Sequence, residues 1–444
     1  MARETKIPLA DVLPLTAGVN EAGHLTVGGC DAVQLAGEFG TPLYVFDDET
    51  LRARCREFQT EFRSRHEDTV VAYGAKAYLG RAIAAIMAEE GMAMDVVSGG
   101  ELAIAASVSF PPERLYFHGN NKSEEELREA LEYGIGRVVI DNFHEMRLLN
   151  GIADGMGRRQ KVLLRLSPGI DPHTHVHTTT GTLDSKFGIP MVDQGEAAVQ
   201  RALEMPGLEL MGLHVHLGSP VFELAPYGKA VPVVLAFAAE MAAKHGLRLA
   251  EFSPGGGFAA QYEESKPAPA VAEYAETITS ALAEGCRKHE LPLPRLIVEP
   301  GRSIAGRAGI ALYTVGSSKD VPGIRRYVSV DGGMADNIRP PMYGSRYEAL
   351  VASKALEPRR ETVSIAGKYC ESGDVLMRDA ELAPLEAGDV LAVATAGAYA
   401  IPMASNYNAS PRPAIVLVRD GEAHLIRRRE TYEDLTRHDV WPLE

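Results

Sequence analysis

Residues 69–101 read TVVAYGAKAYLGRAIAAIMAEEGMAMDVVSGGE and give the clearest indication of the fold class. Thr69–Tyr73 and Met92–Val97 are short apolar runs, and the helix-like segment Gly80–Glu90 lies between them. Strands that are apolar on both faces and are connected through a helix are typical of a covered parallel sheet. The stretch therefore predicts one strand–helix–strand unit of an α/β fold.

The same alternation continues through the middle of the chain. Six further apolar runs predict strands at Arg114–Phe117, Arg137–Ile140, Lys161–Leu166, Leu210–Leu217, Leu249–Ser253 and Arg295–Val298. Helices are predicted between several of them, at Ser123–Tyr133, Val221–His245 and Ala270–His289. Ser123 and Glu126 form a capping box, which marks a helix start. Eight strands separated by helices predict a (β/α)8 TIM-type barrel, with a doubly wound open sheet as the main alternative.

After Arg302 the rhythm changes, because the apolar runs are no longer separated by long helices. Glycine and proline interrupt this part of the chain, and four strands are predicted at Tyr327–Val330, Thr362–Ala366, Val390–Thr395 and Ile415–Val418. We therefore expect a C-terminal antiparallel β domain that also takes in the N-terminal segment. The predicted boundaries are 1–40 for that segment, 41–308 for the barrel and 309–444 for the β domain.

Composition narrows the class of protein. A length of 444 residues suggests two or three domains, and 45% hydrophobic with 24% charged residues is ordinary for a globular protein. The net charge of −15 argues against nucleic acid or an anionic membrane as the main partner. Four cysteines without C-x-x-C spacing, and no apolar stretch long enough to cross a bilayer, favour a reduced cytoplasmic protein.

Polar residues follow the predicted strands at their C-terminal ends, where a (β/α)8 barrel carries its active site. They are Lys76, the His214 and His216 pair with Ser219, the triplet Gly255, Gly256 and Gly257, and Glu299 with Gly301 and Arg302. Each has a structural interpretation as well: a rim lysine, core histidines, a helix cap, a tight turn, or an ion pair between glutamate and arginine. Their common placement at one rim is the informative feature.

Taken together, these groups suit a phosphorylated heterocyclic aldehyde. A lysine can bind an aldehyde as an imine, and a buried carboxylate can keep a ring nitrogen protonated. Glycine N–H groups and an arginine can hold a phosphate. Pyridoxal 5'-phosphate has all of these features.

Several motifs in order along the chain resemble the fold type III, alanine-racemase-like family of pyridoxal-phosphate decarboxylases. The matching segments are Ala75–Ala77, Asp95–Glu101, Gly119–Ser123, Asp184–Gly188, Gly212–Ser219, Gly255–Gly257, Glu299–Arg302, Arg339–Tyr343, Cys370–Asp374, Gly397–Tyr399 and Asn406–Asn408. The Glu-Pro-Gly-Arg segment occurs across the superfamily. The combination of Cys-Glu-Ser-Gly-Asp with Arg-Pro-x-x-Tyr is much more specific.

The resemblance implies a role for each matching residue. Lys76 would bind the cofactor covalently, His216 would stack on its ring, and Glu299 would pair with the ring nitrogen. The remaining cofactor contacts would come from Ser219, Gly255, Gly256, Gly257, Gly301, Arg302 and Tyr399. The substrate would be bound by Arg302, Arg339, Tyr343, Glu371 and Tyr399. Cys370 would be the proton donor and would reach the partner's site, which implies a homodimer.

Within this family the motifs are most similar to those of members that act on diaminopimelate. The expected reaction is decarboxylation of meso-2,6-diaminopimelate to L-lysine and CO2, the last step of lysine biosynthesis. A bidentate fork such as that of Arg339 discriminates a carboxylate from an amine at the far end of the substrate.

Three alternatives stay open. The chain could decarboxylate another amino acid, such as ornithine, lysine, a carboxylated polyamine or a secondary-pathway intermediate. A non-catalytic pyridoxal-phosphate carrier is disfavoured because such barrels lack a C-terminal β domain. A metal-dependent barrel hydrolase could use His214 and His216 with His173, His175 and His177, but the strand ends offer lysine and glycine instead of carboxylates, so we expect no metal.

Overall fold

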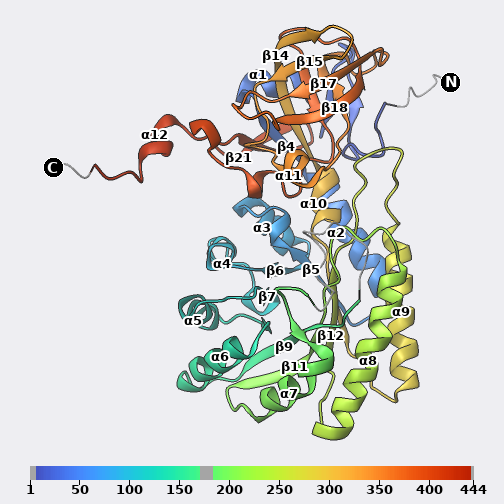
Figure 1. Cartoon of the computed structure of the whole chain (residues 1–444), viewed down its shortest axis with the longest axis vertical. Helices are drawn as coiled ribbons and strands as arrows, with labels where there is room; N and C mark the ends of the chain where they lie inside the picture. Colours follow the sequence, from blue (N-terminus) through green and yellow to red (C-terminus); the bar gives the residue numbers. More distant parts are fainter. Residues whose placement is uncertain (1–6, 171–183, 442–444) are drawn as a thin grey trace. The chain divides into compact units, whose positions relative to one another are not determined.

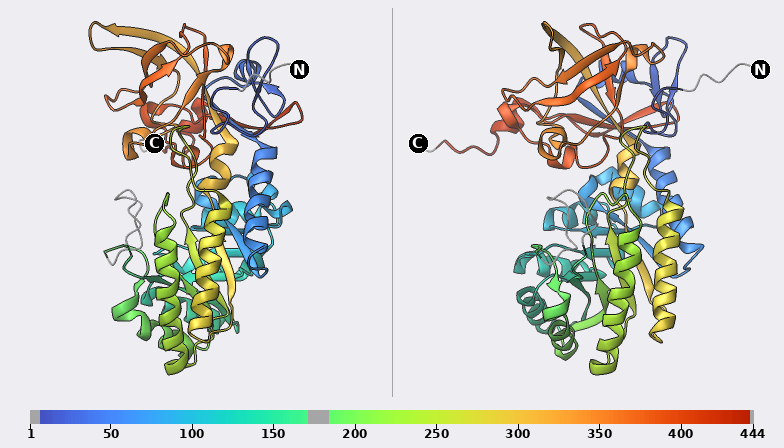
Figure 2. Two further views of the ribbon diagram at one scale, coloured as in Figure 1. Left: turned by 90° about the vertical axis from the view of Figure 1, so that its right-hand side faces the viewer. Right: turned by 45° about the vertical axis from the view of Figure 1, so that its right-hand side comes forward.

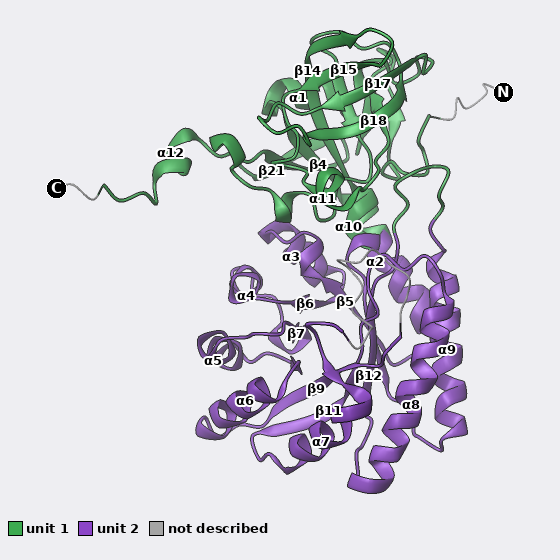
Figure 3. Cartoon of the chain, viewed as in Figure 1, with its two compact units in different colours: residues 1–53, 260–267, 304–444 green, residues 54–259, 268–303 purple. Residues whose placement is uncertain are grey.

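The computed structural model describes residues 7–170 and 184–441, and the chain divides into two compact units. Unit 1 comprises residues 1–53, 260–267 and 304–444, and unit 2 comprises residues 54–259 and 268–303 (Figure 3). Each unit is built from its own sheet, and each is described separately below.

Unit 2 is a closed barrel of eight parallel strands (Figure 1). In chain order they are β5 (Thr69–Gly74), β6 (Ala93–Val96), β7 (Leu115–Phe117), β8 (Arg137–Ile140), β9 (Gln160–Ser167), β11 (Leu208–His214), β12 (Glu251–Gly256) and β13 (Arg295–Glu299). The barrel closes because β13 pairs with β5 and β8 pairs with β9. A short strand, β10 (Ile189–Pro190), adds to β9. The predicted barrel is therefore confirmed, and the open sheet is excluded.

Helices follow most of the barrel strands. They are α3 (Arg81–Glu89), α4 (Gly99–Ala106), α5 (Glu124–Tyr133), α6 (Phe143–Gly155), α7 (Met191–Glu204), α8 (Ala225–His245), α9 (Val271–Lys288) and α10 (Arg302–Ala308), whereas α2 (Asp48–Arg63) precedes the first barrel strand. The predicted capping box of Ser123 and Glu126 is present at the start of α5. The two longest helices, α8 and α9, pack side by side (Figure 2). Within residues 7–170 and 184–441, every helix falls short of the length and apolarity that a membrane crossing requires.

The interior of the barrel contains a layer of apolar side chains. Six strands contribute one buried residue each, namely Ala72, Ala93, Tyr116, Val139, Leu163 and Ile297. Such layers fill (β/α)8 barrels and leave no pore along the axis. The polar side chains of the strand ends therefore stand on a packed floor, which excludes water from one side of the site.

Unit 1 is built on a mixed sheet. Its strand order is β18 (Val375–Leu382), β17 (Glu361–Ala366), β15 (Arg325–Val330), β14 (Gly309–Val321), β4 (Leu43–Asp47), β20 (Ala414–Arg419) and β21 (Glu422–Arg427). Strand β19 (Val390–Val393) pairs with β14 and with β16 (Ala349–Val351). Two short helices, α11 (Arg339–Tyr343) and α12 (Tyr432–Thr436), lie in the same unit.

The expectation of an antiparallel β domain is corrected in one respect. Two of its strand pairs are parallel, β15 with β17 and β20 with β4. Antiparallel pairing follows from short hairpin connections, whereas β4 and β20 are separated by most of the chain. A pairing between segments so distant in sequence leaves no local pattern to recognise.

The N-terminal segment belongs to unit 1, as expected. Strands β1 (Gly18–Val19), β2 (Leu25–Val27) and β3 (Cys30–Asp31) form a small sheet, and α1 (Ala32–Phe39) follows them. Their apolar side chains enter the core of the unit together with those of β14 and β20. The unit extends beyond residue 40 because β4 pairs with β14 and β20, and it also takes in residues 260–267.

Candidate active site

The barrel places Lys76 beside a buried carboxylate. Lys76 lies in the short turn Ala75–Ala77 after β5, and its Nζ donates a hydrogen bond of 2.8 Å to Oδ2 of Asp95 on β6. The side chain of Asp95 is 1% exposed, whereas that of Lys76 is 42% exposed. Lys76 is therefore an ion-paired and accessible amine.

His118 lies between two carboxylates at the end of β7. Its Nε2 is 3.6 Å from Oε1 of Glu299 and 3.9 Å from Oδ1 of Asp95. Burial lowers the pKa of the His118 imidazole to about 4, although the neighbouring carboxylates oppose that shift. The ring is therefore neutral at physiological pH.

Glu299 ends β13 and is held as a carboxylate. The hydroxyl of Ser253 donates a hydrogen bond of 2.8 Å to Oε1, and Nε2 of His214 lies 3.1 Å from the same oxygen. Burial opposes ionisation of Glu299, but the adjacent His214 and His118 rings outweigh it and hold the pKa of Glu299 well below its ordinary value. A buried and ionised carboxylate is the group that a protonated ring nitrogen requires.

His216 lies two residues beyond the end of β11. Its Nδ1 accepts a hydrogen bond of 3.1 Å from the backbone N–H of Gly256, which fixes the orientation of the ring. Burial, together with the cations Arg165 and Lys76, holds the pKa of His216 well below its ordinary value. A neutral imidazole of fixed orientation can stack on a planar heterocycle.

The three glycines at the end of β12 are required by close backbone contacts. A Cβ atom on Gly256 would lie 2.2 Å from the carbonyl oxygen of Glu299, and one on Gly257 would lie 2.2 Å from that of Gly218. Gly255 and Gly257 have φ of +79° and +101°, which side-chain-bearing residues rarely adopt.

The helices near this rim do not begin at the glycine triplet or at Ser219. The glycine triplet does not precede a helix, because α9 begins only at Val271. Two of its three N–H groups are already committed, since Gly255 donates to the Ser253 hydroxyl and Gly256 donates to His216. Ser219 does not cap α8 either, because Leu224 occupies the N-cap position.

Gly301 and Arg302 lie where β13 passes into α10. A Cβ atom on Gly301 would lie 3.0 Å from the carbonyl oxygen of Gly74, so this glycine lets β13 approach the turn that carries Lys76. Arg302 is the first residue of α10 and is 7% exposed. The barrel thus brings together the predicted cofactor residues Lys76, His216, Gly255, Gly256, Gly257, Glu299, Gly301 and Arg302 at the ends of β5, β11, β12 and β13.

In unit 1, Arg339 lies at the start of α11 in an aromatic enclosure. Its guanidinium is 5.2 Å from the ring of Tyr262 and 5.9 Å from the rings of both Tyr347 and Tyr399. It donates hydrogen bonds to the Tyr262 hydroxyl over 2.9 Å and to the Ser345 hydroxyl over 3.1 Å. Arg339 is 6% exposed, and its Nε has no hydrogen-bond partner among the described residues. No salt bridge to Arg339 is present in the described part of the chain.

The other predicted substrate residues lie on more exposed parts of unit 1. Tyr343, at the end of α11, and Tyr399 are half-buried, and Tyr399 has a φ of +60°, which is unusual for a tyrosine. Cys370 and Glu371 are exposed on the segment between β17 and β18. Of the four cysteines, Cys370 alone is exposed.

Asp374 fixes the backbone of the Cys370 segment. Its buried carboxylate accepts hydrogen bonds from the backbone N–H groups of Met334 and Tyr369, over 2.7 and 2.9 Å. The N–H of Cys370 itself donates to Oδ1 of Asn408. The thiol is thus presented to solvent on an anchored loop, which is the arrangement expected of a residue that serves a ligand outside its own unit's core.

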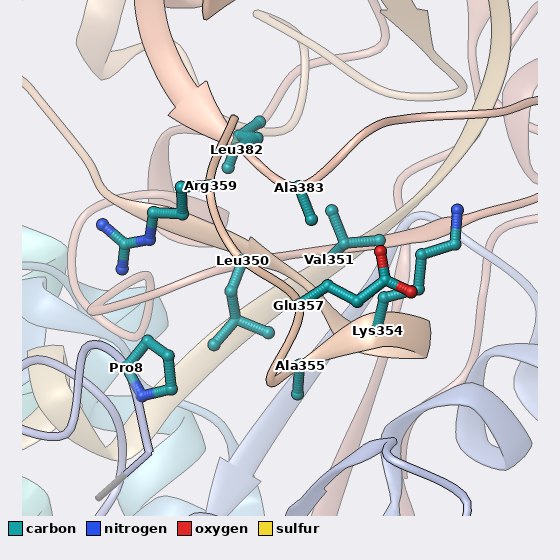
Figure 4. Close-up of a pocket in the computed structure, with 9 residues that line it drawn as sticks. All are labelled: Pro8, Leu350, Val351, Lys354, Ala355, Glu357, Arg359, Leu382 and Ala383. Atoms are coloured by element: carbon teal, nitrogen blue, oxygen red, sulfur yellow. The ribbon is translucent and has the colours of Figure 1, made fainter. Parts of the chain in front are cut away.

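A surface pocket in unit 1 contains none of the predicted site residues (Figure 4). It is lined by Pro8, Leu350, Val351, Lys354, Ala355, Glu357, Arg359, Leu382 and Ala383. The ammonium group of Lys354 in this pocket already donates a hydrogen bond of 2.8 Å to Oδ2 of Asp389. The pocket therefore offers no counterpart to the chemistry at the barrel rim.

Of the ligands named for the metal alternative, His214 and His216 lie in the described residues. Nε2 of His214 is 3.1 Å from Oε1 of Glu299, and Nδ1 of His216 accepts a hydrogen bond from the backbone N–H of Gly256. His173, His175 and His177 lie outside the described residues. Among the described residues, the ligand atoms of His118, His214 and Glu299 do lie within 4.8 Å of one another.

Sequence reasoning missed several residues of these clusters. Asp95 lies inside one of the matching segments but was given no role, and His118 lies directly before another of them, Gly119–Ser123. Because side chains alternate between the two faces of a strand, the sequence indicates which residues of one strand share a face. It does not indicate which strands lie next to each other, so contacts between strands could not be predicted. Ser253, Tyr262 and Tyr347 left no sequence signal, because their partners are distant in the chain.

Comparison with known proteins identifies the cofactor. Residues 48–306 match the family model described as pyridoxal-dependent decarboxylase, pyridoxal binding domain. The residues of the barrel rim fit pyridoxal phosphate, since Lys76 offers an accessible amine and Glu299 a buried carboxylate. Asp95 Oδ1 and His214 Nδ1 are buried without a hydrogen-bond partner in the described residues, so the rim has unused capacity for a polar ligand.

Full-length relatives agree with the family model. The chain is 46% identical over 426 residues to a diaminopimelate decarboxylase from Bacillus subtilis. The aligned residues make up 96% of this chain and 97% of that protein. A diaminopimelate decarboxylase from Synechocystis is 43% identical and covers 98% and 94%.

Solved structures show the same similarity in three dimensions. The diaminopimelate decarboxylase of M. jannaschii, solved also in complex with L-lysine, superposes with a TM-score of 0.90 at 36% identity and covers 96% of this chain and 98% of that one. A lysine/ornithine decarboxylase from Vibrio vulnificus, at 22% identity and a TM-score of 0.74, shares the fold. On the family match, the full-length relatives and the fit of its barrel rim, the chain belongs to the pyridoxal-dependent decarboxylases.

Proposed function

We propose that this enzyme decarboxylates meso-2,6-diaminopimelate to L-lysine and CO2, the last step of lysine biosynthesis. The observation that carries the choice of substrate is Arg339, a buried guanidinium with no acidic partner among the described residues. A guanidinium fork binds a carboxylate through two parallel hydrogen bonds, which an amine cannot accept. Diaminopimelate has a carboxylate at its far end, whereas ornithine and lysine end in an amine.

The names of the relatives support the same substrate. Proteins from several bacteria that are 40–46% identical over nearly the whole chain are diaminopimelate decarboxylases. The lysine/ornithine decarboxylase that shares the fold is much less similar in sequence.

The residues of the barrel rim perform the positioning work of the reaction. Pyridoxal phosphate, when bound, supplies an electron-accepting ring that stabilises the carbanion left at Cα after loss of CO2. Lys76 supplies the amine that holds the aldehyde, and Asp95 accepts the hydrogen bond that places this amine. Glu299, kept ionised by its imidazole neighbours, maintains the proton on the ring nitrogen.

The proton that replaces the carboxyl group comes from Cys370 in this proposal. A thiol positioned as general acid delivers its proton to Cα after CO2 has left. Cys370 is suited to this role because it is exposed on a loop whose backbone Asp374 anchors. Glu371, beside it, is available for the ammonium group of the substrate, and Tyr343 and Tyr399 complete the substrate contacts.

We further propose a cytoplasmic homodimer in which the Cys370 segment of one subunit serves the site of its partner. Cys370 and Glu371 are both exposed, so the segment is available to a second subunit. The four cysteines are free thiols, in keeping with a reducing compartment.

A substrate panel tests the proposed reaction. The holoenzyme is supplied separately with meso-diaminopimelate, L-lysine and L-ornithine, and released CO2 is measured together with the amine product. We expect CO2 and L-lysine from meso-diaminopimelate, with turnover of the other two at least ~100-fold slower. Faster release from lysine or ornithine would assign the enzyme to the alternative substrates instead.

A further inference from the structure

Two imidazoles from different strands converge on the carboxylate of Glu299. His214 ends β11 and His118 follows β7, and their rings lie 4.9 Å apart in an edge-to-face arrangement. Nε2 of His214 is 3.1 Å and Nε2 of His118 is 3.6 Å from Oε1 of Glu299. All three side chains are at most 5% exposed. Such burial places the carboxylate in a medium of low polarity, where each neighbouring dipole counts strongly.

His118 has a second carboxylate within reach. Its backbone N–H donates to the carbonyl oxygen of Val96, which continues the β6–β7 pairing and brings the ring beside Asp95. Nε2 of His118 lies 3.9 Å from Oδ1 of Asp95. Neither of these two buried atoms has a hydrogen-bond partner among the described residues. A buried polar atom without a hydrogen-bond partner costs roughly 1–3 kcal/mol. A small movement that brought His118 Nε2 and Asp95 Oδ1 within hydrogen-bond distance would therefore be favourable.

The tautomer with its proton on Nε2 is the one that places an N–H dipole near both carboxylates. A neutral imidazole in that form directs one N–H dipole toward Oε1 of Glu299 and Oδ1 of Asp95. Asp95 in turn accepts the hydrogen bond from Lys76. His118 thereby lies between the carboxylate of Asp95, which holds Lys76, and the carboxylate of Glu299 on β13.

Several other charged groups lie around Glu299, so His118 is one of several groups that influence its ionisation. The charged or titratable groups that act on Glu299 include His214, His118, Lys76 and Arg165. Lys76 is already paired with Asp95, and Arg165 faces Asp141 at 3.8 Å. His214, Ser253 and His118 lie within 3.6 Å of Oε1 of Glu299.

We propose that His118 is a positioning residue that keeps Glu299 ionised and oriented toward the ring nitrogen of the cofactor. It acts through its Nε2–H dipole and does not touch the reacting atoms. Without that dipole, the buried carboxylate gains affinity for protons. A proton shared between Glu299 and the ring nitrogen then moves toward Glu299, and the electron-accepting power of the ring falls. This inference rests on the proposed pairing of Glu299 with the ring nitrogen.

Two amide variants separate a role of Nε2 from a general packing role. In His118→Gln the side-chain amide nitrogen reaches the position of Nε2, whereas in His118→Asn it reaches only that of Nδ1. Both variants keep a small polar side chain, and they differ in the reach of their N–H donor. His118→Phe, which keeps the ring volume without nitrogen, replaces His118→Asn if the latter does not give holoenzyme.

The measurement is the nitrogen-15 NMR shift of the ring nitrogen in holoenzyme loaded with 15N-labelled pyridoxal 5'-phosphate. This shift reports protonation of the ring nitrogen independently of turnover. We expect a protonated nitrogen in the wild type and in His118→Gln. In His118→Asn or His118→Phe we expect the shift to move toward the value of the unprotonated ring, with the apparent Kd of the cofactor raised ~10-fold.

The proposal is overturned if the short-reach variant and His118→Gln give the same shift, whether both match the wild type or both depart from it. It is also overturned if the wild-type protein carries a stoichiometric metal ion that is lost with His118, because His118, His214 and Glu299 would then be ligands. His66→Phe is the matched control, since the His66 ring contacts a backbone carbonyl within unit 2 but lies before β5. Wild-type protein that binds no cofactor would contradict the proposed function instead.

Discussion

At the scale of single residues, the site depends on two buried carboxylates, Asp95 and Glu299, and on the groups that contact them. Asp95 forms an ion pair with Lys76, whereas the His214 ring helps to hold the pKa of Glu299 well below its ordinary value. An unpaired buried carboxylate would take up a proton. The barrel rim thus holds two anions close together and uses them for different tasks.

Arg339 gives the prediction that bears on substrate choice. Replacement by methionine removes the fork that we assign to the distal carboxylate and leaves a side chain of comparable length. We expect kcat/KM for meso-diaminopimelate to fall ~100-fold, about 2.7 kcal/mol, with the loss mainly in KM. Steady-state kinetics with meso-diaminopimelate measures it.

Arg346→Met is the control, because Arg346 lies close by in sequence and its side chain is 81% exposed. It should leave both kinetic constants within about twofold of the wild type. An unchanged KM in Arg339→Met would remove Arg339 from the substrate contacts.

Glu101 gives a prediction about pH. Burial raises the pKa of Glu101 to about 7, with Asp95 adding to the shift and a hydrogen bond from the Val97 N–H opposing it. Its pKa in the unfolded chain is about 4.3, so between roughly pH 4 and pH 7 the folded state holds more protons. Acidification through this window therefore stabilises the wild type relative to Glu101→Gln, which does not titrate.

The measurement is urea denaturation of both cofactor-free proteins at pH 8 and pH 5. The difference in free energy of unfolding should shift in favour of the wild type by roughly 1–3 kcal/mol at pH 5. A shift of the opposite sign would show that Glu101 is already ionised in the folded protein well below neutral pH.

At the scale of elements, strand ends are what place the chemistry. The end of β12 lies so close to β13 that a Cβ atom on Gly256 would be 2.2 Å from the carbonyl oxygen of Glu299. Gly256→Ala should therefore separate β12 from β13 and destabilise the protein by about 2–4 kcal/mol. It should also weaken cofactor binding, because His216 and Glu299 would both move.

Thermal and urea denaturation of the variants measure this effect. Gly228→Ala is the matched control, because this position lies inside α8 and its nearest neighbour to an added Cβ is 3.8 Å away. Alanine there should stabilise the helix by up to about 1 kcal/mol. Equal stability of the two variants would mean that the strand end can relax without cost.

The same elements show what local sequence can and cannot predict. The runs Arg137–Ile140 and Thr69–Tyr73 correspond closely to β8 and β5, because a short apolar run between helix signals has few other interpretations. The run predicted at Leu210–Leu217 was displaced, since β11 ends at His214 and the chain then leaves the strand. Local propensity does not report the bulge between Leu210 and Gly212, which depends on the neighbouring strand β9.

For the site, the sequence predicted the residues that carry the chemistry better than the side chains that contact them. Lys76 and Glu299 stood out because each is a charged residue within three positions of the end of an apolar run. His118 could be recognised only with the barrel in hand, since its partners Asp95 and Glu299 come from β6 and β13. Arg339 was identified by its motif, but the tyrosine rings around it come from segments distant in the chain.

At the scale of the whole molecule, the two units are assembled from interleaved parts of the chain. Unit 1 takes in residues 1–53, 260–267 and 304–444, so one excursion of only eight residues leaves the barrel and returns. A segment of eight residues is too short for its amino-acid composition to mark it as part of another unit. Division of the chain into consecutive blocks therefore could not predict it.

The proposed homodimer predicts subunit complementation. Lys76→Ala and Cys370→Ala should each be inactive as homodimers, with kcat reduced by roughly 10²–10⁴-fold. If Cys370 serves the partner's site, a mixed dimer has one intact site, and random exchange of subunits should restore about a quarter of wild-type activity.

The assay mixes the two purified variants under conditions that allow subunit exchange and follows CO2 release with time. Mixing Lys76→Ala with wild-type protein serves as the control for exchange alone. Absence of recovery, with dimer exchange shown independently by a tag on one variant, would place Cys370 in the site of its own subunit.

Borohydride reduction of the holoenzyme followed by peptide mapping tests the central claim most directly. Reduction makes the link between the cofactor and its lysine permanent, so the modified peptide identifies the amine that holds the aldehyde. We predict one pyridoxyl group per chain, carried by the peptide that contains Lys76. Modification of a different lysine, or a protein that takes up no pyridoxal 5'-phosphate, would contradict it.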